Sequence, residues 1–356
     1  MNLLKIPEEI KGRWQHALIL TYGLDIPFFE NGLWRQFGKA CNNKIILADG
    51  KRYLQTCESY ANSKGLIRHL NQHYVAEGIF APYSAHAKLI LLANDQHGRL
   101  LVGSGNLGYQ GYASGGEMFT KYEYSEEAPD TLREFVAVRQ FIDGLIDKGY
   151  IGEQGRYHIQ EHMYSKCPWL FGNPQRESQV RHNLNKSFID QLQETIGNTV
   201  VDELWIMAPF YDEKCIALEK MLSTFQPKTT HLLIQQQRTS ADPLTLMNIV
   251  DAHNGRVKIH SVSLENNPYL HTKMYLFKLG SDSICLQGSP NLSQVAMLRS
   301  GNKANVELAN LLTGERDTFD YIFGELQMEE VSSAHDLEIS YHAINDEAAD
   351  SEKDTP

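Results

Sequence analysis

Short apolar runs alternate with amphipathic segments along most of the chain. Residues 17–37 begin as an apolar strand, continue through a turn rich in proline and aromatic residues, and end with the spacing of a helix. Residues 203–222 repeat this order. Apolar residues 43–50 and 229–237 predict one further strand in each region. Strands that alternate with helices in this way are typical of α/β folds.

The region between these stretches is predicted to be helical at both ends. Residues 129–150 have helical spacing with a glycine near their end, and residues 178–197 show a second helical pattern. Residues 159–178 contain aromatic residues, proline and glycine without a clear period, so they predict a long loop. Such a loop either packs as a crossover between two halves or gates a substrate, and we favour the packed crossover.

Two strand-turn-strand segments carry the same polar residues at the same positions. Residues 86–106 read HAKLILLANDQHGRLLVGSGN, and residues 271–291 read HTKMYLFKLGSDSICLQGSPN. In each segment a histidine and a lysine stand two residues apart, which places them on one face of an extended chain. A G-S-x-N sequence begins 17 residues after the histidine in both segments. Because only these two of the 14 histidines are followed in this way by lysine, the match indicates an internal duplication.

The duplication predicts two related domains. Matching positions are separated by roughly 182 to 187 residues, far more than the unit of a solenoid repeat. We expect a first repeat with the crossover loop in residues 1–177, a second repeat in residues 178–328, and an acidic tail or linker in residues 329–356. The last of these stretches holds nine acidic residues and one lysine, so it carries −8 of the net charge of −11.

The composition is that of a globular protein, and we expect it in the cytoplasm. The 356 residues are 42% hydrophobic, but no apolar run is long enough to span a bilayer, and the N-terminus lacks the apolar core of a signal peptide. The five cysteines are scattered and form no C-x-x-C pair, which argues against a disulfide framework or a zinc ribbon. The negative charge argues mildly against a partner with many phosphates, although most of that charge lies in residues 329–356.

The duplicated residues suit the cleavage of a phosphodiester at one composite site. A neutral imidazole can attack phosphorus while a protonated imidazole gives its proton to the leaving oxygen. Ammonium groups and other hydrogen-bond donors can hold the non-bridging oxygens. Two copies of the motif would supply both the nucleophile and the acid, so we expect a covalent phosphohistidine and neither a metal nor another cofactor.

The paired H-x-K and G-S-x-N motifs resemble those of the phospholipase D superfamily, and the repeats that carry them extend from residue 17 to near residue 310. The resemblance implies an α/β/α fold for each half, a pseudo-twofold relation between the halves, and one metal-independent active site at their interface. It makes His86 the nucleophile and His271 the general acid. The resemblance further implies that Lys88, Lys273, Asn106 and Asn291 bind phosphate, with Ser104 and Ser289 beside them, and that Glu117 and Glu307 orient the histidines.

One position departs from the family pattern. The fuller motif has aspartate five residues after the lysine, where this chain has Ala93 and Lys278. The departure points away from the lipid-hydrolysing branches of the superfamily and gives more weight to Glu117 and Glu307. The alternative interpretation of these two glutamates is that they are plain surface acids.

Three functions are compatible with these residues. A bacterial nuclease that cleaves DNA, or RNA, is favoured; similar family members occur beside helicase or restriction-type modules, some of them in anti-phage defence. Such an enzyme would bind nucleic acid without stable membrane association, would need no oligomer for its site, and could use Tyr109 or Tyr112 to stack on bases, unless these tyrosines pack in the core. A lipid phosphodiesterase or phosphatidyltransferase would need a basic or amphipathic membrane-facing surface, which the sequence does not show. The third possibility is a module that binds nucleic acid without cleaving it.

Overall fold

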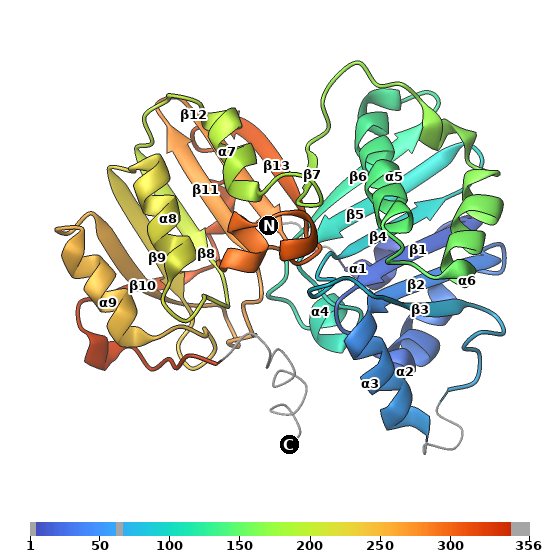
Figure 1. The fold of residues 1–356 in the computed structure, drawn as a ribbon, viewed down its shortest axis with the longest axis horizontal. Coiled ribbons are helices and arrows are strands. Elements are labelled where there is room, and N and C mark those ends of the chain that lie inside the picture. The colour runs from blue at the N-terminus through green and yellow to red at the C-terminus, as the bar shows by residue number, and fades with distance from the viewer. Residues whose placement is uncertain (1–4, 62–66, 343–356) are drawn as a thin grey trace. The chain divides into compact units, whose positions relative to one another are not determined.

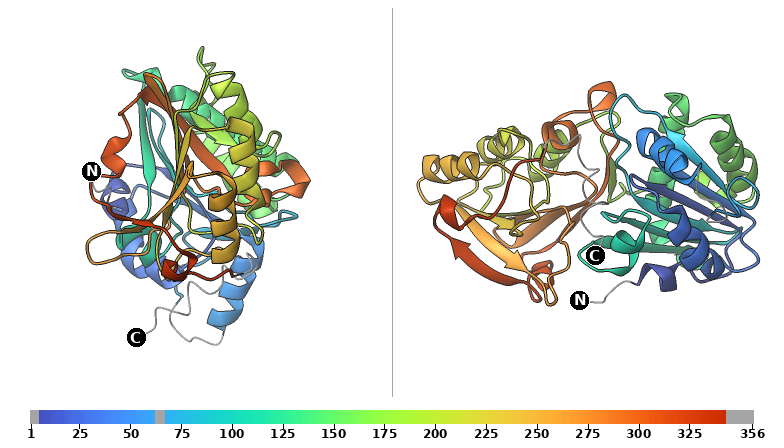
Figure 2. Two further views of the ribbon diagram at one scale, coloured as in Figure 1. Left: turned by 90° about the vertical axis from the view of Figure 1, so that its left-hand side faces the viewer. Right: turned by 90° about the horizontal axis from the view of Figure 1, so that it is seen from below.

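The chain folds into two compact units in the computed structural model, which describes residues 5–61 and 67–342 (Figures 1 and 2). The first unit contains Met1–Lys186, Gln287–Ser289 and Ser300–Leu311. The second unit contains Ser187–Leu286, Pro290–Arg299 and Leu312–Pro356. After it has entered the second unit, the chain therefore returns twice to the first.

The first unit is built on a six-stranded mixed sheet. Its strands are β1 His16–Thr21, β2 Asn43–Asp49, β3 Val75–Ile79, β4 Leu89–Ala93, β5 His97–Gly103 and β6 Phe119–Ser125. They lie in the order β3-β2-β1-β4-β5-β6. β1, β2 and β3 run parallel, whereas β4, β5 and β6 are each antiparallel to the preceding strand in this order. The carboxyl ends of the three parallel strands therefore meet at one end of the sheet.

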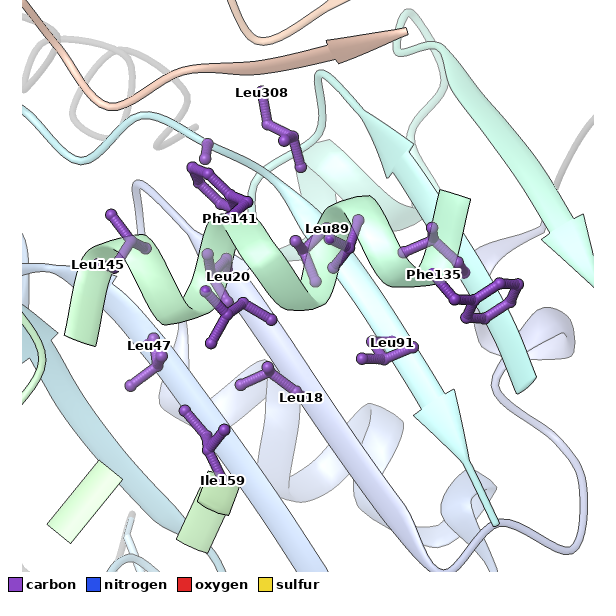
Figure 3. Close-up of a cluster of buried hydrophobic side chains, with 14 of the residues drawn as sticks. Leu18, Leu20, Leu47, Leu89, Leu91, Phe135, Phe141, Leu145, Ile159 and Leu308 are labelled. Atoms are coloured by element: carbon purple, nitrogen blue, oxygen red, sulfur yellow. The ribbon is translucent and has the colours of Figure 1, made fainter. Parts of the chain in front are cut away.

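Helices cover both faces of this sheet (Figure 2). They are α1 Ile6–Glu9, α2 Ile26–Phe28, α3 Gly50–Ala61, α4 Tyr109–Ala113, α5 Leu132–Asp147 and α6 Glu153–Tyr157. α5 confirms the helix predicted in residues 129–150. Its Phe135 and Phe141 pack in one cluster with Leu89 and Leu91 of the sheet (Figure 3).

Alternate residues of the central strands face two different cores. On β1, Leu18 and Leu20 belong to the cluster under α5, whereas Ala17 and Ile19 belong to a second cluster on the opposite face. Side chains alternate between the faces of a strand, so a strand buried on both sides needs apolar residues at every position. This explains the continuous apolar run of β1 and gives the strand ends a rigid support.

The second unit repeats the arrangement of the first. Its strands include β8 Glu203–Met207, β9 Thr229–Ile234, β10 Val257–Ser263, β11 Met274–Leu279, β12 Asp282–Gly288 and β14 Gln327–Val331, in the order β14-β10-β9-β8-β11-β12. β8, β9 and β10 run parallel, and β11 is antiparallel to β8. The longer helices are α7 Phe188–Ile196, α8 Ile216–Phe225 and α9 Pro243–Ala252.

The strand orders confirm the two similar α/β halves that the sequence predicted. β3-β2-β1-β4-β5 in the first half corresponds to β10-β9-β8-β11-β12 in the second. The registers agree as well, because Leu18 lies opposite Leu91 and Leu204 lies opposite Phe277, and 73 residues separate the partners in each pair. None of the helices within residues 5–61 and 67–342 has the length and apolar character that a membrane crossing requires.

The helix predicted in residues 178–197 begins later than expected. Val180–His182 forms the short strand β7, which pairs with the first residues of β13 Leu308–Glu315. α7 starts only after Ser187, whose hydroxyl oxygen accepts a hydrogen bond from Asp190 N. A strand of three residues is too short to show a period in the sequence, so the helical pattern of the following residues hides it. This pairing also keeps residues 178–186 in the first unit, beyond the expected boundary at residue 177.

The predicted loop in residues 159–178 is partly helical. A π-helical segment spans His158–Tyr164, and a 3₁₀ turn spans Pro168–Phe171. Met163 and Leu170 are buried in the cluster under α5, so the segment packs on the sheet as a crossover. Irregular helical turns lack the regular spacing on which the prediction of helices depends.

The expected acidic tail begins as an ordered strand. Its first residues lie in β14, which pairs antiparallel with β10 at the edge of the second sheet. The outward acidic side chains of β14 suit an edge strand, because charge discourages pairing with a further strand. Residues 343–356 of the expected tail lie outside the described residues.

Candidate active site

The two H-x-K motifs occupy equivalent places in the two sheets. His86 and Lys88 come directly before β4, and His271 and Lys273 come directly before β11. All four side chains are buried, with 8% exposure for His271 and 1% or less for the other three. A pair of buried lysines is costly unless anions or other acceptors meet the ammonium groups.

His86 is paired with a buried carboxylate that comes from the other sequence repeat. Its Nδ1 lies 3.0 Å from Oε2 of Glu307, and both side chains are at most 2% exposed. Both residues belong to the first unit, because the chain returns to this unit in Ser300–Leu311. The backbone reinforces the contact, since His86 N donates to Val306 O over 2.8 Å.

The carboxylate of Glu307 is fully satisfied by short contacts. Asn305 Nδ2 donates to Oε1 over 3.1 Å, and Ser289 Oγ donates to Oε2. Burial alone would raise the pKa of Glu307, but the interactions with His86, Lys88 and Ser289 outweigh it and hold the pKa below its usual range. Glu307 is therefore ionised at neutral pH.

An ionised Glu307 determines where the proton of His86 sits. A carboxylate only accepts hydrogen bonds, so the Nδ1 of His86 must carry the hydrogen that it donates to Oε2. In the neutral imidazole the lone pair is then on Nε2. This tautomer is the one that can attack an electrophile through Nε2.

The serines of the two G-S-x-N sequences make matching contacts. Ser104 Oγ donates to Oε2 of Glu117, just as Ser289 Oγ does to Glu307. Each hydroxyl also accepts from the residue after the glutamate, over 3.0 Å from Met118 N and 2.9 Å from Leu308 N. These contacts favour a positioning role for both serines, which hold the glutamates at the start of β6 and β13, over direct contact with phosphate.

Two polar residues that sequence analysis missed hold the chain just before each motif. Asp49, at the end of β2, accepts a hydrogen bond from Ala85 N over 2.9 Å. Gln235, directly after β9, accepts one from Leu270 N over 2.8 Å. β2 and β9 are equivalent strands, so the same contact fixes the residue that precedes each histidine. The sequence contained a signal, because each residue is the first polar position after an apolar run.

Aromatic rings next to each histidine were also missed. The ring of Tyr22 lies edge-on to His86 with centroids 5.2 Å apart, and Lys88 Nζ lies 5.5 Å from the centre of the same ring. Phe210 takes a comparable place at His271, with centroids 6.2 Å apart. Both aromatic residues follow the first strand of their half, in the Pro-aromatic turns noted in the sequence.

The first asparagine lies in a tightly packed turn. Asn106 Oδ1 accepts from Gly23 N over 3.4 Å, and the next residue, Leu107, donates through its N to Thr21 Oγ1 over 2.8 Å. A Cβ on Gly111 would come within 2.1 Å of Asn106 O, so only glycine allows α4 to approach this turn. Asn291, the equivalent residue of the second half, is 2% exposed.

The second motif has a different local pairing. Lys273 Nζ lies 2.7 Å from His271 Nε2 and donates to His271 O over 2.8 Å. An ammonium group has no acceptor, so Nε2 of His271 carries a lone pair in this arrangement. Protonation of that nitrogen would break the contact and release the ammonium group toward an anion.

The predicted site residues fall into both units. The first unit contains His86, Lys88, Ser104, Asn106, Glu117, Ser289 and Glu307, and the second contains His271, Lys273 and Asn291. The approach of His86 and His271 to one phosphorus, and the histidine partner of Glu117, stay predictions.

The two positions that depart from the family motif have structural roles: Ala93 is buried in β4, and Lys278 Nζ pairs with Asp320 Oδ1 over 2.7 Å. No cluster of metal ligands occurs within the described part of the chain.

Comparison with known proteins rests on structure alone. No family model matches the sequence, and no curated protein matches it at a significant level. Yeast tyrosyl-DNA phosphodiesterase matches with a TM-score of 0.56 at 11% identity, over 88% of this chain and 86% of its own. Phosphatidylserine synthase from Haemophilus influenzae Rd KW20 matches with a TM-score of 0.55 at 11% identity, over 94% and 86%. Both proteins are members of the phospholipase D superfamily.

This chain has the phospholipase D fold. A third member with this fold, polyphosphate kinase from Porphyromonas gingivalis, matches with a TM-score of 0.51 at 12% identity, over 96% of this chain and 48% of its own. The three neighbours differ in the reactions that their names describe. The phospholipase D fold therefore confirms the architecture predicted from the sequence, while the reaction must be argued from the residues of this chain.

Proposed function

We propose that this chain is a phosphodiesterase that cleaves nucleic acid, DNA in preference to RNA, through a phosphohistidine on His86. The observation that carries the proposal is the buried pair of His86 and Glu307. A carboxylate on Nδ1 keeps the lone pair on Nε2 and strengthens it as a nucleophile. Burial of an ionised carboxylate has a large free-energy cost, which a histidine that served only for packing would not require.

The reaction takes two balanced steps. In the first, Nε2 of His86 bonds to phosphorus, the bond to the leaving oxygen breaks, and protonated His271 gives that oxygen its proton. In the second, a water molecule gives a proton to His271, its oxygen bonds to phosphorus, and the phosphorus–nitrogen bond breaks. Throughout, Lys88, Lys273, Asn106 and Asn291 hold the non-bridging oxygens, while Glu117 and Glu307, with Ser104 and Ser289, keep the histidines oriented.

Exposed aromatic side chains beside the first motif favour nucleic acid as the substrate. Phe80 is 56% exposed, Tyr83 is 43% exposed and Tyr109 is 61% exposed, and all three lie within a few residues of motif positions. Stacking of a base on such a ring contributes about 1–3 kcal/mol. Tyr112, the other tyrosine considered from the sequence, is buried between Phe28 and Phe119 and serves the core.

The substrate is tested by a panel of labelled single-stranded DNA, double-stranded DNA, RNA and phosphatidyl lipids in vesicles. We expect cleavage of a DNA substrate that is abolished in His86→Ala. A phosphatidylserine synthase shares the fold, so a lipid is the second candidate. Cleavage of the lipid alone would replace nucleic acid by that candidate, and binding of DNA without cleavage of any substrate would refute the enzyme.

Alanine substitutions of the two histidines should affect the reaction in different ways. His86→Ala removes the covalent route, so no phosphoenzyme should form. His271→Ala should slow the release of a sugar hydroxyl by about 10²-fold or more, but it should affect an activated leaving group such as p-nitrophenolate far less. A phosphohistidine trapped at His271 would reverse the two roles.

Catalysis should persist after treatment with EDTA, because lysines, asparagines and a protonated histidine supply the positive charge that metals supply elsewhere. Loss of activity with EDTA and its return with Mg²⁺ would contradict this mechanism.

An association with a helicase or restriction-type module and a role in anti-phage defence belong to the same proposal. Phage plaque counts on cells with the intact protein and with His86→Ala test that role.

A further inference from the structure

A polar pocket lies in the first unit, away from the H-x-K motif. Its volume is 650 Å³, within the range of pockets that hold small organic ligands. Its walls come from three segments of the chain: Trp34–Lys44, Asn71–Val75, and the pair Gln154 and His158. Nothing in the proposed phosphodiesterase reaction uses these residues.

The pocket is at the opposite end of the sheet from His86. Asn43 and Lys44 begin β2 and Val75 begins β3, whereas Asp49 ends β2 and bonds to the residue before His86. A strand of seven residues spans about 20 Å. A ligand in this pocket is therefore distinct from a phosphodiester at the motif.

The lining of the pocket is cationic. It includes Arg35, Lys39 and Lys44, and none of the described residues that line the pocket is acidic. This concentration of positive charge stands out in a chain with a net charge of −11. Glu30, a buried carboxylate, does not line the pocket and accepts instead from the Arg68 and His69 amides and from the Tyr74 hydroxyl.

Among these three cationic side chains, Lys44 most needs an anion, because it alone is buried. It is only 8% exposed, and its ammonium group donates to Cys41 O and lies 4.6 Å from the centre of the Trp34 ring. Burial lowers its pKa. Within the described residues no carboxylate forms an ion pair with this ammonium, so an anion in the pocket would supply the counter-charge that the fold omits.

The lining also contains neutral polar groups. They include the amide side chains of Asn71, Gln72 and Gln154 and the imidazoles of His73 and His158. His158 is held in place by its Nδ1, which lies 3.0 Å from Asn43 Oδ1. Amides and imidazoles both donate and accept hydrogen bonds, as the edges of a base and the hydroxyls of a sugar require.

We propose that this pocket binds a nucleoside phosphate, with the phosphates held by Arg35, Lys39 and Lys44 and the nucleoside by the amides and imidazoles. The volume exceeds what a single inorganic phosphate needs, and the lining offers both cations for a charged part and neutral polar groups for the rest of the ligand. This site is additional to the proposed phosphodiesterase centre and does not depend on it.

The test measures binding by isothermal titration calorimetry to the full chain with His86→Ala, which prevents turnover at the motif. The probes are ATP, AMP and inorganic phosphate. We expect saturable binding of one nucleotide per chain, tighter than that of inorganic phosphate. Lys39→Gln and Lys44→Gln should each weaken ATP binding about ten-fold, as expected for loss of one hydrogen bond to a charged group. Lys148→Gln, an exposed lysine on another surface, is the matched control and should bind as the parent does.

Lys39 is exposed, so Lys39→Gln keeps the test valid if the buried Lys44→Gln variant does not fold. Equal affinity for ATP in the parent and in Lys39→Gln would overturn the proposal, as would the absence of binding by all three probes. Binding of inorganic phosphate as tight as that of ATP would overturn the nucleoside part. ATP binding that is lost on mutation of Lys88 and retained in Lys39→Gln would place the nucleotide at the motif instead.

Discussion

A single carboxylate determines both the tautomer and the orientation of the proposed nucleophile. Glu307 accepts from Nδ1 of His86 and is itself held by Asn305 and Ser289, so the imidazole has little freedom to rotate or to move its proton. Sequence analysis selected both His86 and Glu307 but could not pair them. They are 221 residues apart, and their contact depends on the return of the chain to the first unit, which no local pattern encodes.

Replacement of Glu307 by glutamine should greatly reduce the proposed phosphodiesterase activity without unfolding the chain. An amide can donate to Nδ1 and so favours the wrong tautomer of His86; we expect hydrolysis of bis-p-nitrophenyl phosphate to fall by about 10²-fold or more. Glu134→Gln is the matched control, because Glu134 is likewise buried, at 1% exposure, but bonds to Arg133. That variant should lose stability in urea unfolding and keep its activity. Similar activities in the two variants would show that Glu307 does not act on the nucleophile.

The stability of the folded chain should also depend on pH through the ionisation of Glu307. The pKa of Glu307 is lower in the folded chain than its ordinary value of 4.5. The stability that this contributes is therefore complete above about pH 4.5 and is lost as the pH falls through the lower folded value. Glu307→Gln should flatten this part of the stability curve in urea unfolding below pH 4.5.

At the scale of elements, each motif depends on the strand beside it. Asp49 connects β2 to the residue before His86 and also accepts from Arg52 N in the first turn of α3. Gln235 makes the corresponding connection from β9. The sequence predicted the strands and the duplication, but a side chain that bonds to a distant backbone amide leaves no periodic pattern, so these connections emerged only from the structure.

Asp49→Ala should lower both stability and activity. It removes a helix cap and frees the chain before His86, so we expect a loss of about 1–2 kcal/mol in the free energy of unfolding and a reduced turnover rate. Asp242→Ala is the control, because Asp242 caps α9 through Thr245 N over 2.7 Å, and among the described residues its hydrogen bonds reach neither motif. It should lose comparable stability and retain activity. Full activity in Asp49→Ala would show that the connection is not needed for catalysis.

A stack of rings across three strands should make the second unit sensitive to acid. The ring centroids of Trp205 on β8 and His231 on β9 lie 3.8 Å apart, and His231 Nδ1 lies 2.9 Å from Nε2 of His260 on β10. Burial, followed by the effect of His260, lowers the pKa of His231 to about 4.

Because the folded pKa of His231 lies below the ordinary value of 6.5, the unfolded chain binds the proton more readily. The stability is complete above pH 6.5 and declines as the pH falls from 6.5 to about 4. His231→Phe keeps a ring in the stack and removes the titrating group, so its Tm should fall less steeply over this range. Thermal unfolding from pH 7.5 to pH 4 measures both slopes, and identical slopes would contradict the prediction.

At the scale of the whole molecule, the sequence predicted the α/β class, the duplication and the residues of both motifs. It did not predict β7, the helical turns of the crossover, or the division of the second repeat between two units. These features depend on contacts between distant segments: β7 forms only because Val180–His182 meets the start of β13. Periodicity reports local burial and carries no information on which distant segment supplies the partner.

The uneven charge of the chain should affect the proposed association with nucleic acid. Residues 343–356 contain five acidic residues and one lysine, a net charge of −4. Their removal should tighten binding of a labelled DNA oligonucleotide by about two- to five-fold at low salt, because like charges repel the phosphates. The difference should vanish near 1 M salt, where the Debye length is about 3 Å.

Fluorescence anisotropy on the His86→Ala background measures this binding without cleavage. A variant with its five carboxylates changed to amides serves as the control, since it removes the charge and keeps the length. Equal affinities of all three proteins at low salt would contradict the electrostatic effect.

The late return of Ser300–Leu311 to the first unit has a consequence for the newborn chain. A ribosome that adds about 5–20 residues per second needs roughly 10–45 seconds to pass from His86 to Glu307. During that interval the nascent polypeptide holds the histidine without the carboxylate that selects its tautomer. A product released early, before residue 307, is left in the same condition. The order of synthesis would thus delay the proposed hydrolysis until residue 307 has been made and folded, which would spare the cell a partly made chain able to attack phosphodiesters.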